Sequence, residues 1–233
     1  MPPVNPFYQL VGTNRMDDAA VFIDGFNLYH GMDDAGLRPW LWVDLCKLAR
    51  LLVPKAAHLA AVNYYTAYVK TDGSRERQGA FLEANRELNP GLLHIEPGFM
   101  QDEDCCTCMK CKVTFRRWQE KRTDVNMAVD IVRGAMRQPT PAFDLALIVT
   151  GDADQVAAIK AVQSEGLTAL VRFPPSRNSA HLTQTVGGTT KAYPISLSQL
   201  RQAQMPDVVM RNGHAIHRPQ EWGVRPDYTA PTE

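Results

Sequence analysis

Short apolar runs alternate along the chain with longer segments whose apolar residues have helical spacing. The runs are rich in β-branched and aromatic residues, which is typical of strands buried on both faces of a parallel sheet. They occupy residues 19–24, 59–69, 92–96, 143–150 and 167–173, and a last edge strand is expected at 192–195. Helices are predicted at 44–52, 74–88, 123–136 and 156–166, with a further short helix after the loop at 174–179.

This alternation predicts βαβ units, and therefore an α/β fold with a mainly parallel sheet. Right-handed crossovers leave few topologies, and we expect the doubly wound strand order 3-2-1-4-5. In that order strands one and four lie side by side, at the point where ligands bind beyond the carboxyl ends of the strands. Asp24 and Asp152, which follow these two strands, would then face each other.

The length of 233 residues fits one domain with extensions. We expect a loose arm at 1–18, the main domain at 19–205 and a tail with little regular structure at 206–233. An irregular insert at about 97–120 holds four cysteines. The helix after this insert carries a continuous apolar stripe, which consists of Val125, Ala128, Val129, Val132 and Met136.

Charge and composition narrow the class of protein. Lys and Arg together number 25, as do Asp and Glu, so no overall field attracts polyanions and a nucleic-acid surface would have to be a local basic patch. No apolar run is long enough to span a bilayer, and the amino terminus lacks a signal-peptide pattern. Four of five cysteines crowd between 105 and 111, unlike a secreted disulfide framework. These features predict a cytoplasmic protein without a membrane partner.

Carboxylates follow two of the predicted strands and open one predicted helix. Asp24 comes where the first strand gives way to a loop, Asp124 starts the helix after the insert, and Asp152 and Asp154 follow the fourth strand. Each alone also fits a turn or a helix N-terminus, where negative charge is favourable. Mid-helix Asp130 fits an exposed or supporting acid.

A cluster of such acids predicts a metal site. Clustered carboxylates repel one another and normally need cations. Oxygen ligands without His or thiolate suit Mg²⁺ or Mn²⁺, which can activate water and stabilise charge on a phosphodiester. The pattern therefore indicates metal-assisted phosphoryl chemistry.

Three sequence blocks resemble the motifs of the NYN family of PIN-like ribonuclease domains. The blocks are 22–28, 121–130 and 149–154, and the resemblance runs in the family's motif order from about Ala19 to Leu200. It implies a PIN-like three-layer α/β/α sandwich and metal-dependent cleavage of RNA. Gln155 stands where many relatives have an aromatic residue, a departure that concerns packing more than chemistry.

Site residues carried over by position from this resemblance coincide with the carboxylates already singled out. The resemblance implies that Asp24, Asp124 and Asp152 bind the metal, with Asn27 beside them and Asp154 as a fourth acid. Some relatives have regulatory rather than nuclease roles, so catalysis does not follow from the motifs alone.

The cysteine cluster comprises Cys105, Cys106, Cys108 and Cys111. The last two form a Cys-x-x-Cys pair, which is half of a common zinc site, but the usual distant second pair is missing. His94 or a thiol of a second subunit could complete the site, which leaves a homodimer open. Similar family members often carry such a pair before the middle acidic motif, which favours a structural zinc knuckle over a redox pair or idle surface thiols. Cys46, on a predicted helix, is expected in the core.

A basic stretch with aromatic residues precedes Asp124. Phosphates bind such cations and unpaired bases stack on such aromatics, so we expect a single-stranded RNA path here, although a solvated charged face has the same composition. The predicted RNA-binding residues are Arg116, Arg117, Trp118, Lys121 and Arg122, together with Arg172 and Arg177 near the loop after strand five.

The leading functional hypothesis is a cytoplasmic endoribonuclease that uses Mg²⁺ or Mn²⁺, with the metal generating the attacking hydroxide. One alternative is an RNA-binding or regulatory module without catalysis. Another is an acid-cluster phosphatase, which is disfavoured because Gly25 and Phe26 follow Asp24 where an Asp-x-Asp motif would stand.

Overall fold

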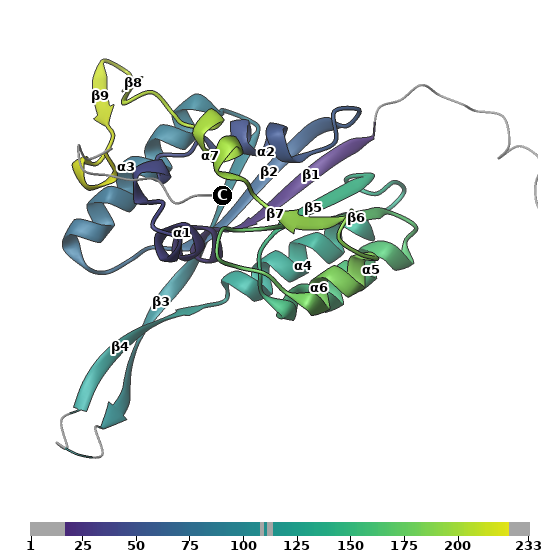
Figure 1. Cartoon of the computed structure of the whole chain (residues 1–233), viewed down its shortest axis with the longest axis horizontal. Helices are drawn as coiled ribbons and strands as arrows, with labels where there is room; N and C mark the ends of the chain where they lie inside the picture. Colours follow the sequence, from purple (N-terminus) through teal and green to yellow (C-terminus); the bar gives the residue numbers. More distant parts are fainter. Residues whose placement is uncertain (1–16, 108–109, 111–113, 224–233) are drawn as a thin grey trace, which may run out of the picture.

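The computed structural model describes residues 17–107, 110 and 114–223 and contains a central sheet between two helical layers (Figure 1). The sheet has the order β4-β3-β2-β1-β5-β6-β7. Its strands are β1 (Asp18–Asp24), β2 (His58–Ala67), β3 (Leu93–Thr107), β4 (Thr114–Lys121), β5 (Leu145–Val149), β6 (Thr168–Phe173) and β7 (Ala192–Pro194). All neighbours are parallel except β3 and β4. The predicted order 3-2-1-4-5 is confirmed, with the expected edge strand beside it.

Helices cover both faces of the sheet (Figure 1). One layer contains α1 (Gly25–Asp34), α2 (Leu45–Leu52), α3 (Asp72–Leu88) and α7 (Leu197–Gln202). The other contains α4 (Thr123–Ala135), α5 (Val156–Ser164) and α6 (Ala180–Val186). Short 3-10 turns are η2 (Arg38–Trp40), η3 (Ala153–Gln155) and η4 (Gln220–Trp222). None of the described helices is long and apolar enough to cross a membrane.

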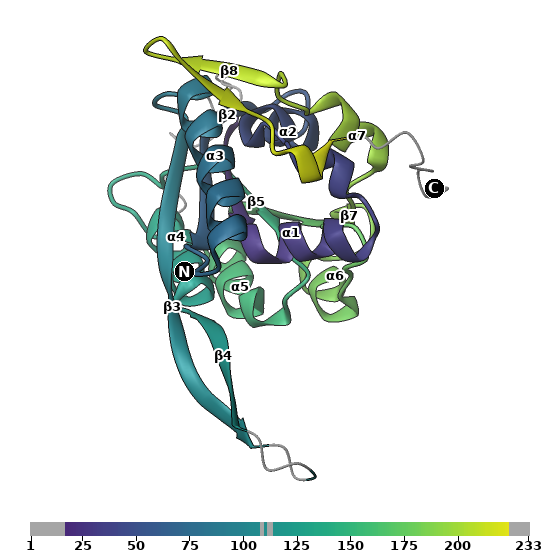
Figure 2. The same cartoon turned by 90° about the vertical axis from the view of Figure 1, so that its left-hand side faces the viewer.

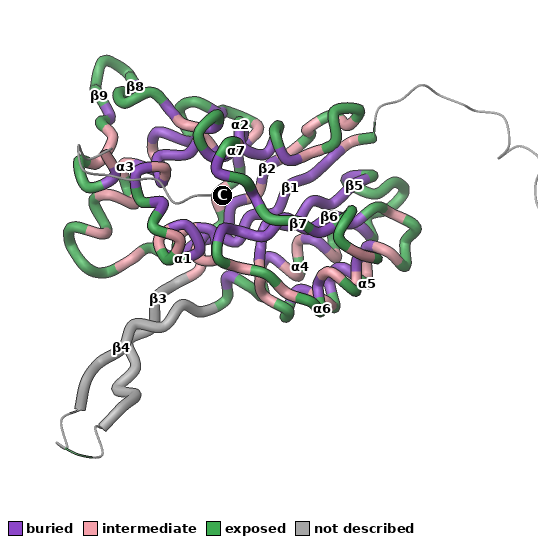
Figure 3. Tube along the Cα trace, viewed as in Figure 1, coloured by how far each residue is buried: buried purple, intermediate pink, exposed green. Residues whose placement is uncertain are grey.

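The central strand β1 contributes to two hydrophobic cores, one on each face of the sheet. Val21 and Ile23 pack with the first helical layer, while Ala20 and Phe22 pack with the second. Since successive side chains of a strand point to opposite faces, a strand covered on both sides must be apolar throughout. Figure 3 shows the continuous burial of this strand. Cys46 belongs to the first core, as expected.

The first strand leads directly into a helix, which corrects the expected loop. α1 begins at Gly25, immediately after Asp24. The turn is tight because Gly25 has no side chain: a Cβ there would stand 2.6 Å from the Tyr65 carbonyl oxygen and 2.6 Å from the Tyr64 ring. Asp24 is therefore the N-cap of α1 as well as the last residue of β1.

The segment expected to be irregular, 97–120, mostly forms a two-stranded antiparallel ribbon. β3 pairs with β2 as far as Gly98 and with β4 from Phe99, which is paired with Lys121. The ribbon therefore projects beyond the carboxyl edge of the sheet (Figures 1 and 2). Pro97 has no N–H to donate to a neighbouring strand. It is tolerated because β4 pairs with β3 only from Phe99 onward, so at Pro97 the edge of β3 that faces away from β2 needs no hydrogen bond.

The segment after 206 also has regular structure, contrary to expectation. β8 (Val208–Arg211) and β9 (His214–His217) form a hairpin beside α3, and η4 follows. Trp222 is 5% exposed and packs in the first core, within 6.1 Å of the Phe81 ring. Because the neighbours of Trp222 in the sequence are polar, the composition of this segment predicted an irregular tail.

Helix α4 buries a different face from the predicted stripe. Its buried residues are Thr123, Met127, Ile131 and Ala135, a row with a spacing of four. Val125, Val129 and Met136 are exposed, and Ala128 and Val132 are half-buried. Both rows have helical periodicity, and the position of the sheet decides between them.

Candidate active site

Asp24 is a nearly buried carboxylate at the junction of β1 and α1, with 6% of its surface exposed. Its Oδ1 accepts a hydrogen bond from the Asn27 backbone N–H at 2.9 Å, which caps the helix. Its Oδ2 accepts a hydrogen bond from the Thr150 hydroxyl at 3.1 Å. The carboxylate thus links the carboxyl ends of β1 and β5, which are neighbours in the sheet.

Electrostatics at Asp24 disfavour its charged form. Burial raises its pKa from 3.8 to about 6, and the charges of Asp124 and Asp152 act in the same direction. The hydrogen bonds from Asn27 and Thr150 oppose this rise. A buried acid that is repelled by other carboxylates at the carboxyl edge of a sheet is characteristic of functional sites.

Asp152 stands at the end of the neighbouring strand and is held by local hydrogen bonds. Its N–H donates to Thr150 Oγ1 at 3.1 Å, and its Oδ1 accepts from the Asp154 N–H at 2.9 Å. Asn27 Oδ1 accepts from the Gly151 N–H at 2.9 Å, which ties α1 to this turn. Asn27 is therefore a positioning residue for the Asp152 turn, beside the acids as predicted.

Asp124 reaches the same edge from the first turn of α4. Partial burial raises its pKa, and the charges of Asp152 and Asp154 raise it further. The Gln155 amide, which is buried, donates to the Asp124 carbonyl oxygen at 3.1 Å and so joins η3 to α4. The structure therefore brings all four predicted acids into one electrostatically interacting group.

The chemistry of this group fits a hard divalent cation, because every donor is a carboxylate oxygen. Among the described residues, however, no three His, Cys, Asp or Glu side chains are close enough together to hold a metal ion. Asp24 accepts hydrogen bonds at both oxygens, from the Asn27 N–H and from the Thr150 hydroxyl, and Asp152 Oδ1 accepts from the Asp154 N–H. The arrangement is a set of suitable donors rather than a closed cage.

Two predicted RNA-binding arginines differ in their surroundings. Arg177 lies beside the acids. Its Cβ is so close to Gly151, the residue before Asp152, that a Cβ placed on Gly151 would stand only 2.9 Å away. Its Nη2 pairs with Asp34 at 2.6 Å. Arg172 is only 3% exposed. Its guanidinium lies 3.7 Å from the centre of the Tyr193 ring and donates to the carbonyl oxygens of Val171, Lys191 and Leu52.

Arg172 is therefore a structural residue that cannot contact RNA in this conformation, and its predicted binding role is wrong. The sequence around Arg172 does not indicate that its side chain is buried, because an arginine near a loop is usually exposed. Arg122 is exposed, directly before α4, with a left-handed φ of 76°.

The remaining predictions fall on parts that the structure does not describe. Cys108 and Cys111 lie outside the described residues. The backbone of the β3–β4 ribbon is described, but the side chains of Cys105, Cys106, Arg116, Arg117, Trp118 and Lys121 are not.

Three polar residues join the site that the sequence did not assign to it. Thr150 bonds the Asp24 carboxylate, Gln155 positions Asp124, and Tyr65 donates to Asp130 at 3.1 Å. The last bond gives Asp130 a structural partner within the second layer. Of the three, only Thr150 could have been linked to the site from the sequence, because it directly precedes Gly151 and Asp152.

The chain forms a three-layer α/β/α sandwich with carboxylates at the ends of its central strands, which is the arrangement expected of a PIN-like fold. The NYN domain model matches residues 18–186, and the chain belongs to the NYN domain family. NYN domains are nuclease-like and act on RNA. The NYN resemblance seen in the sequence is thereby confirmed.

One solved structure shares this fold. It is the crystal structure of a protein of unknown function from Vibrio parahaemolyticus, with a TM-score of 0.53 and 15% sequence identity over 79% of this chain and 96% of that chain. No curated protein matches the chain in sequence.

Proposed function

We propose that this protein is an endoribonuclease that hydrolyses phosphodiester bonds of single-stranded RNA with a divalent metal ion, Mg²⁺ or Mn²⁺. The observation that carries the proposal is the buried Asp24 carboxylate, whose pKa is raised to about 6 by burial and by Asp124 and Asp152. Such repulsion is costly in a folded protein unless a cation relieves it. The NYN family supports the choice of RNA.

Asp24, Asp124 and Asp152 would hold the ion, and Asp154 would support it. When bound, such an ion supplies an activated water and stabilises negative charge on the phosphate. The chain contributes position: Asn27 and Thr150 fix the two strand ends, and Gln155 fixes the start of α4. Arg177 adds a cation at the same edge.

The β3–β4 ribbon is the proposed path of the RNA strand. Its second strand returns into α4 just before Asp124, so a phosphate held near the base of the ribbon lies close to the acids. The sequence of this strand includes Arg116, Arg117 and Lys121. Contacts of this kind bind the backbone without reading bases.

The test is cleavage of a single-stranded RNA in Mn²⁺ by wild type and Asp24→Asn. We expect the variant to lose at least roughly a thousandfold in rate, because removal of a metal ligand takes away several kcal/mol of transition-state stabilisation. Asn keeps the helix cap, so the fold is preserved. EDTA should abolish wild-type cleavage, and cleavage by the variant at the wild-type rate would refute the assignment.

A second candidate is an RNA-binding NYN module without catalysis. It is favoured by the capping roles of Asp24 and Asp152, which give both acids a structural purpose. Tight RNA binding by a wild-type protein that does not cleave with Mg²⁺ or Mn²⁺ would support this candidate.

A further inference from the structure

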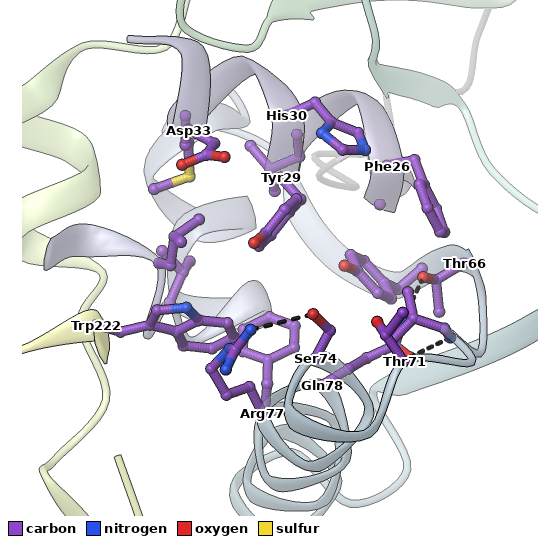
Figure 4. A pocket seen from close by; sticks show the side chains of 18 residues that line it. Phe26, Tyr29, His30, Asp33, Thr66, Thr71, Ser74, Arg77, Gln78 and Trp222 are labelled. Carbon is purple, nitrogen blue, oxygen red and sulfur yellow. Dashed lines mark hydrogen bonds between the residues drawn. The ribbon is translucent and has the colours of Figure 1, made fainter. Parts of the chain in front are cut away.

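A pocket adjoins the acidic edge on the α1–α3 face of the sheet (Figure 4). Its volume of about 540 Å³ lies within the range of roughly 300–1,000 Å³ typical of small-molecule sites. Gly25 and Phe26, the two residues after Asp24, form one side of it. Thr66, on another side, follows Tyr65, whose backbone is level with Asp24 in the sheet. The pocket and the acids therefore share one edge.

Aromatic rings make up much of the pocket wall. They come from three helical segments and β2: Phe26, Tyr29, His30, Tyr64, Phe81 and Trp222. The ring centres of Tyr29 and Trp222 are 6.4 Å apart, so one continuous aromatic surface runs from α1 to η4. Unpaired RNA bases bind proteins by stacking on such surfaces.

Polar groups line the opposite side, where β2 leads into α3. They are Thr66, Thr71, Ser74, Arg77 and Gln78. Figure 4 shows Tyr29 and Ser74 pointing toward one another across the pocket. A base presents flat apolar faces and a polar edge, and this pocket offers both kinds of wall.

The polar wall is rigid before any ligand arrives. The Gln78 amide donates to Thr66 Oγ1 at 3.2 Å and to the Ala67 carbonyl at 2.9 Å, and it accepts from the Val69 N–H at 3.0 Å. Arg77 donates to Ser74 Oγ at 3.1 Å and to Glu221 at 3.0 Å, which holds η4 and its Trp222 against α3. A site organised in advance loses less conformational entropy on binding.

We propose that this pocket takes one unstacked base of the RNA strand, while the neighbouring backbone phosphate lies at Asp24 and Asp152. The inference rests on the proposed function, since it takes RNA as the substrate. Phe26 marks the boundary, because it follows the acid by two residues and lines the pocket. The pocket thereby gives the cleavage site a base preference that phosphate contacts cannot supply.

The probes are single-stranded ribo-oligonucleotides with 2-aminopurine at one position, shifted one nucleotide at a time. Binding and fluorescence are measured in EDTA, so that cleavage plays no part. We expect quenching at one position of the bound strand, where the analogue stacks on the aromatic wall. Tyr29→Ala, which removes wall area, and Ser74→Phe, which fills the pocket, should both relieve the quenching and weaken binding roughly tenfold.

The matched control is Tyr68→Ala, which removes a tyrosine that is 43% exposed and does not line the pocket. It should bind and quench like wild type. Absence of a quenched position in wild type, or wild-type behaviour of both pocket variants, would overturn the base pocket even in an active nuclease. Position-specific quenching by a protein that never cleaves RNA would support the pocket and count against the nuclease function alone.

Discussion

At the residue scale, the hydrogen bonds of Asp24 and its buried position have opposite effects on the protonation of its carboxyl group. It caps α1 and bonds Thr150, which favours a charged carboxylate, while burial and two neighbouring acids favour a neutral one. Burial dominates, because the pKa rises from 3.8 to about 6. The folded protein therefore binds a proton at Asp24 in a pH range where the unfolded chain does not.

This difference predicts a pH-dependent gain in stability for Asp24→Asn without metal. Below pH 3.8 both states of wild type hold the proton, and stability contributed by the neutral carboxyl is lost as pH rises from 3.8 through about 6. Asn does not titrate. The free energy of unfolding of the variant should therefore rise relative to that of wild type by about 3 kcal/mol across this window, at about 1.4 kcal/mol per pKa unit. Denaturant unfolding at several pH values in EDTA measures the difference; an unchanged difference between pH 4 and 7 would contradict it.

The acids themselves could be predicted from the sequence, because apolar runs end at Asp24 and before Asp152 and adjacent parallel strands end at one edge. Their hydrogen-bond partners could not. Thr150 bonds an oxygen 126 positions away, and Gln155 bonds a carbonyl 31 positions away. Such contacts depend on the register of the sheet and on how helices are docked, which local patterns do not specify.

At the scale of elements, α4 shows how two apolar rows compete for one core. The buried row passes through Met127 and Ile131, while Val125 and Val129 are left in solvent. The helix itself was predictable from its periodicity, but its rotation depends on contacts with β1, β2 and β3. The 3.6-residue period identifies a helix without choosing between neighbouring faces.

The orientation of α4 predicts unequal effects of two substitutions. Met127→Ala should lower the free energy of unfolding by roughly 2–5 kcal/mol, because Met127 is 1% exposed and a cavity remains. Val129→Lys should change it by less than about 0.5 kcal/mol, since Val129 is 46% exposed. Chemical denaturation of both variants measures this; a larger loss for Val129→Lys would restore the predicted stripe.

The carboxy-terminal segment, which comprises the β8–β9 hairpin and η4, makes two kinds of contact with α3. Arg211 pairs with Glu83 at 2.7 Å in solvent, whereas Trp222 is buried among rings. Exposed ion pairs contribute little, and buried aromatic area contributes much.

We therefore expect Trp222→Ala to destabilise the protein by roughly 3–5 kcal/mol and Arg211→Ala by less than about 1 kcal/mol. Thermal unfolding of the two variants beside wild type provides the comparison. Equal small effects would show that Trp222 does not anchor this segment.

At the scale of the whole molecule, the acids and the pocket lie at the carboxyl edge of the sheet. The β3–β4 ribbon projects from the same edge (Figures 1 and 2). Parallel strands end together, so a site built at their carboxyl ends receives residues from distant parts of the chain. The sequence predicted this end and the strand order. It did not predict the ribbon or the anchored hairpin, because Pro97 and the polar residues after 206 favour irregular structure locally.

The ribbon gives a prediction about salt dependence. The double variant Arg117→Ala/Lys121→Ala should bind single-stranded RNA more weakly whatever its sequence, because phosphate contacts carry no base information. The slope of log affinity against log salt should flatten by about 0.7 for each phosphate that the variant no longer neutralises. Turnover at saturating RNA should fall much less than affinity. Titrations at several salt concentrations decide the matter, and coincident slopes would move the RNA path elsewhere.

The double duty of Asp24 limits what this position can become in the course of evolution. A lineage that abandons chemistry but keeps the fold still needs an N-cap for α1 and an acceptor for Thr150. Asn meets the first need and removes the buried charge, and its amide can donate to the Thr150 hydroxyl instead of accepting from it, whereas Ala does neither. Descendants without activity are therefore expected to keep Asn or Asp at this position. An Asp that is conserved here is weaker evidence of catalysis than a conserved Asp at a position without a structural role.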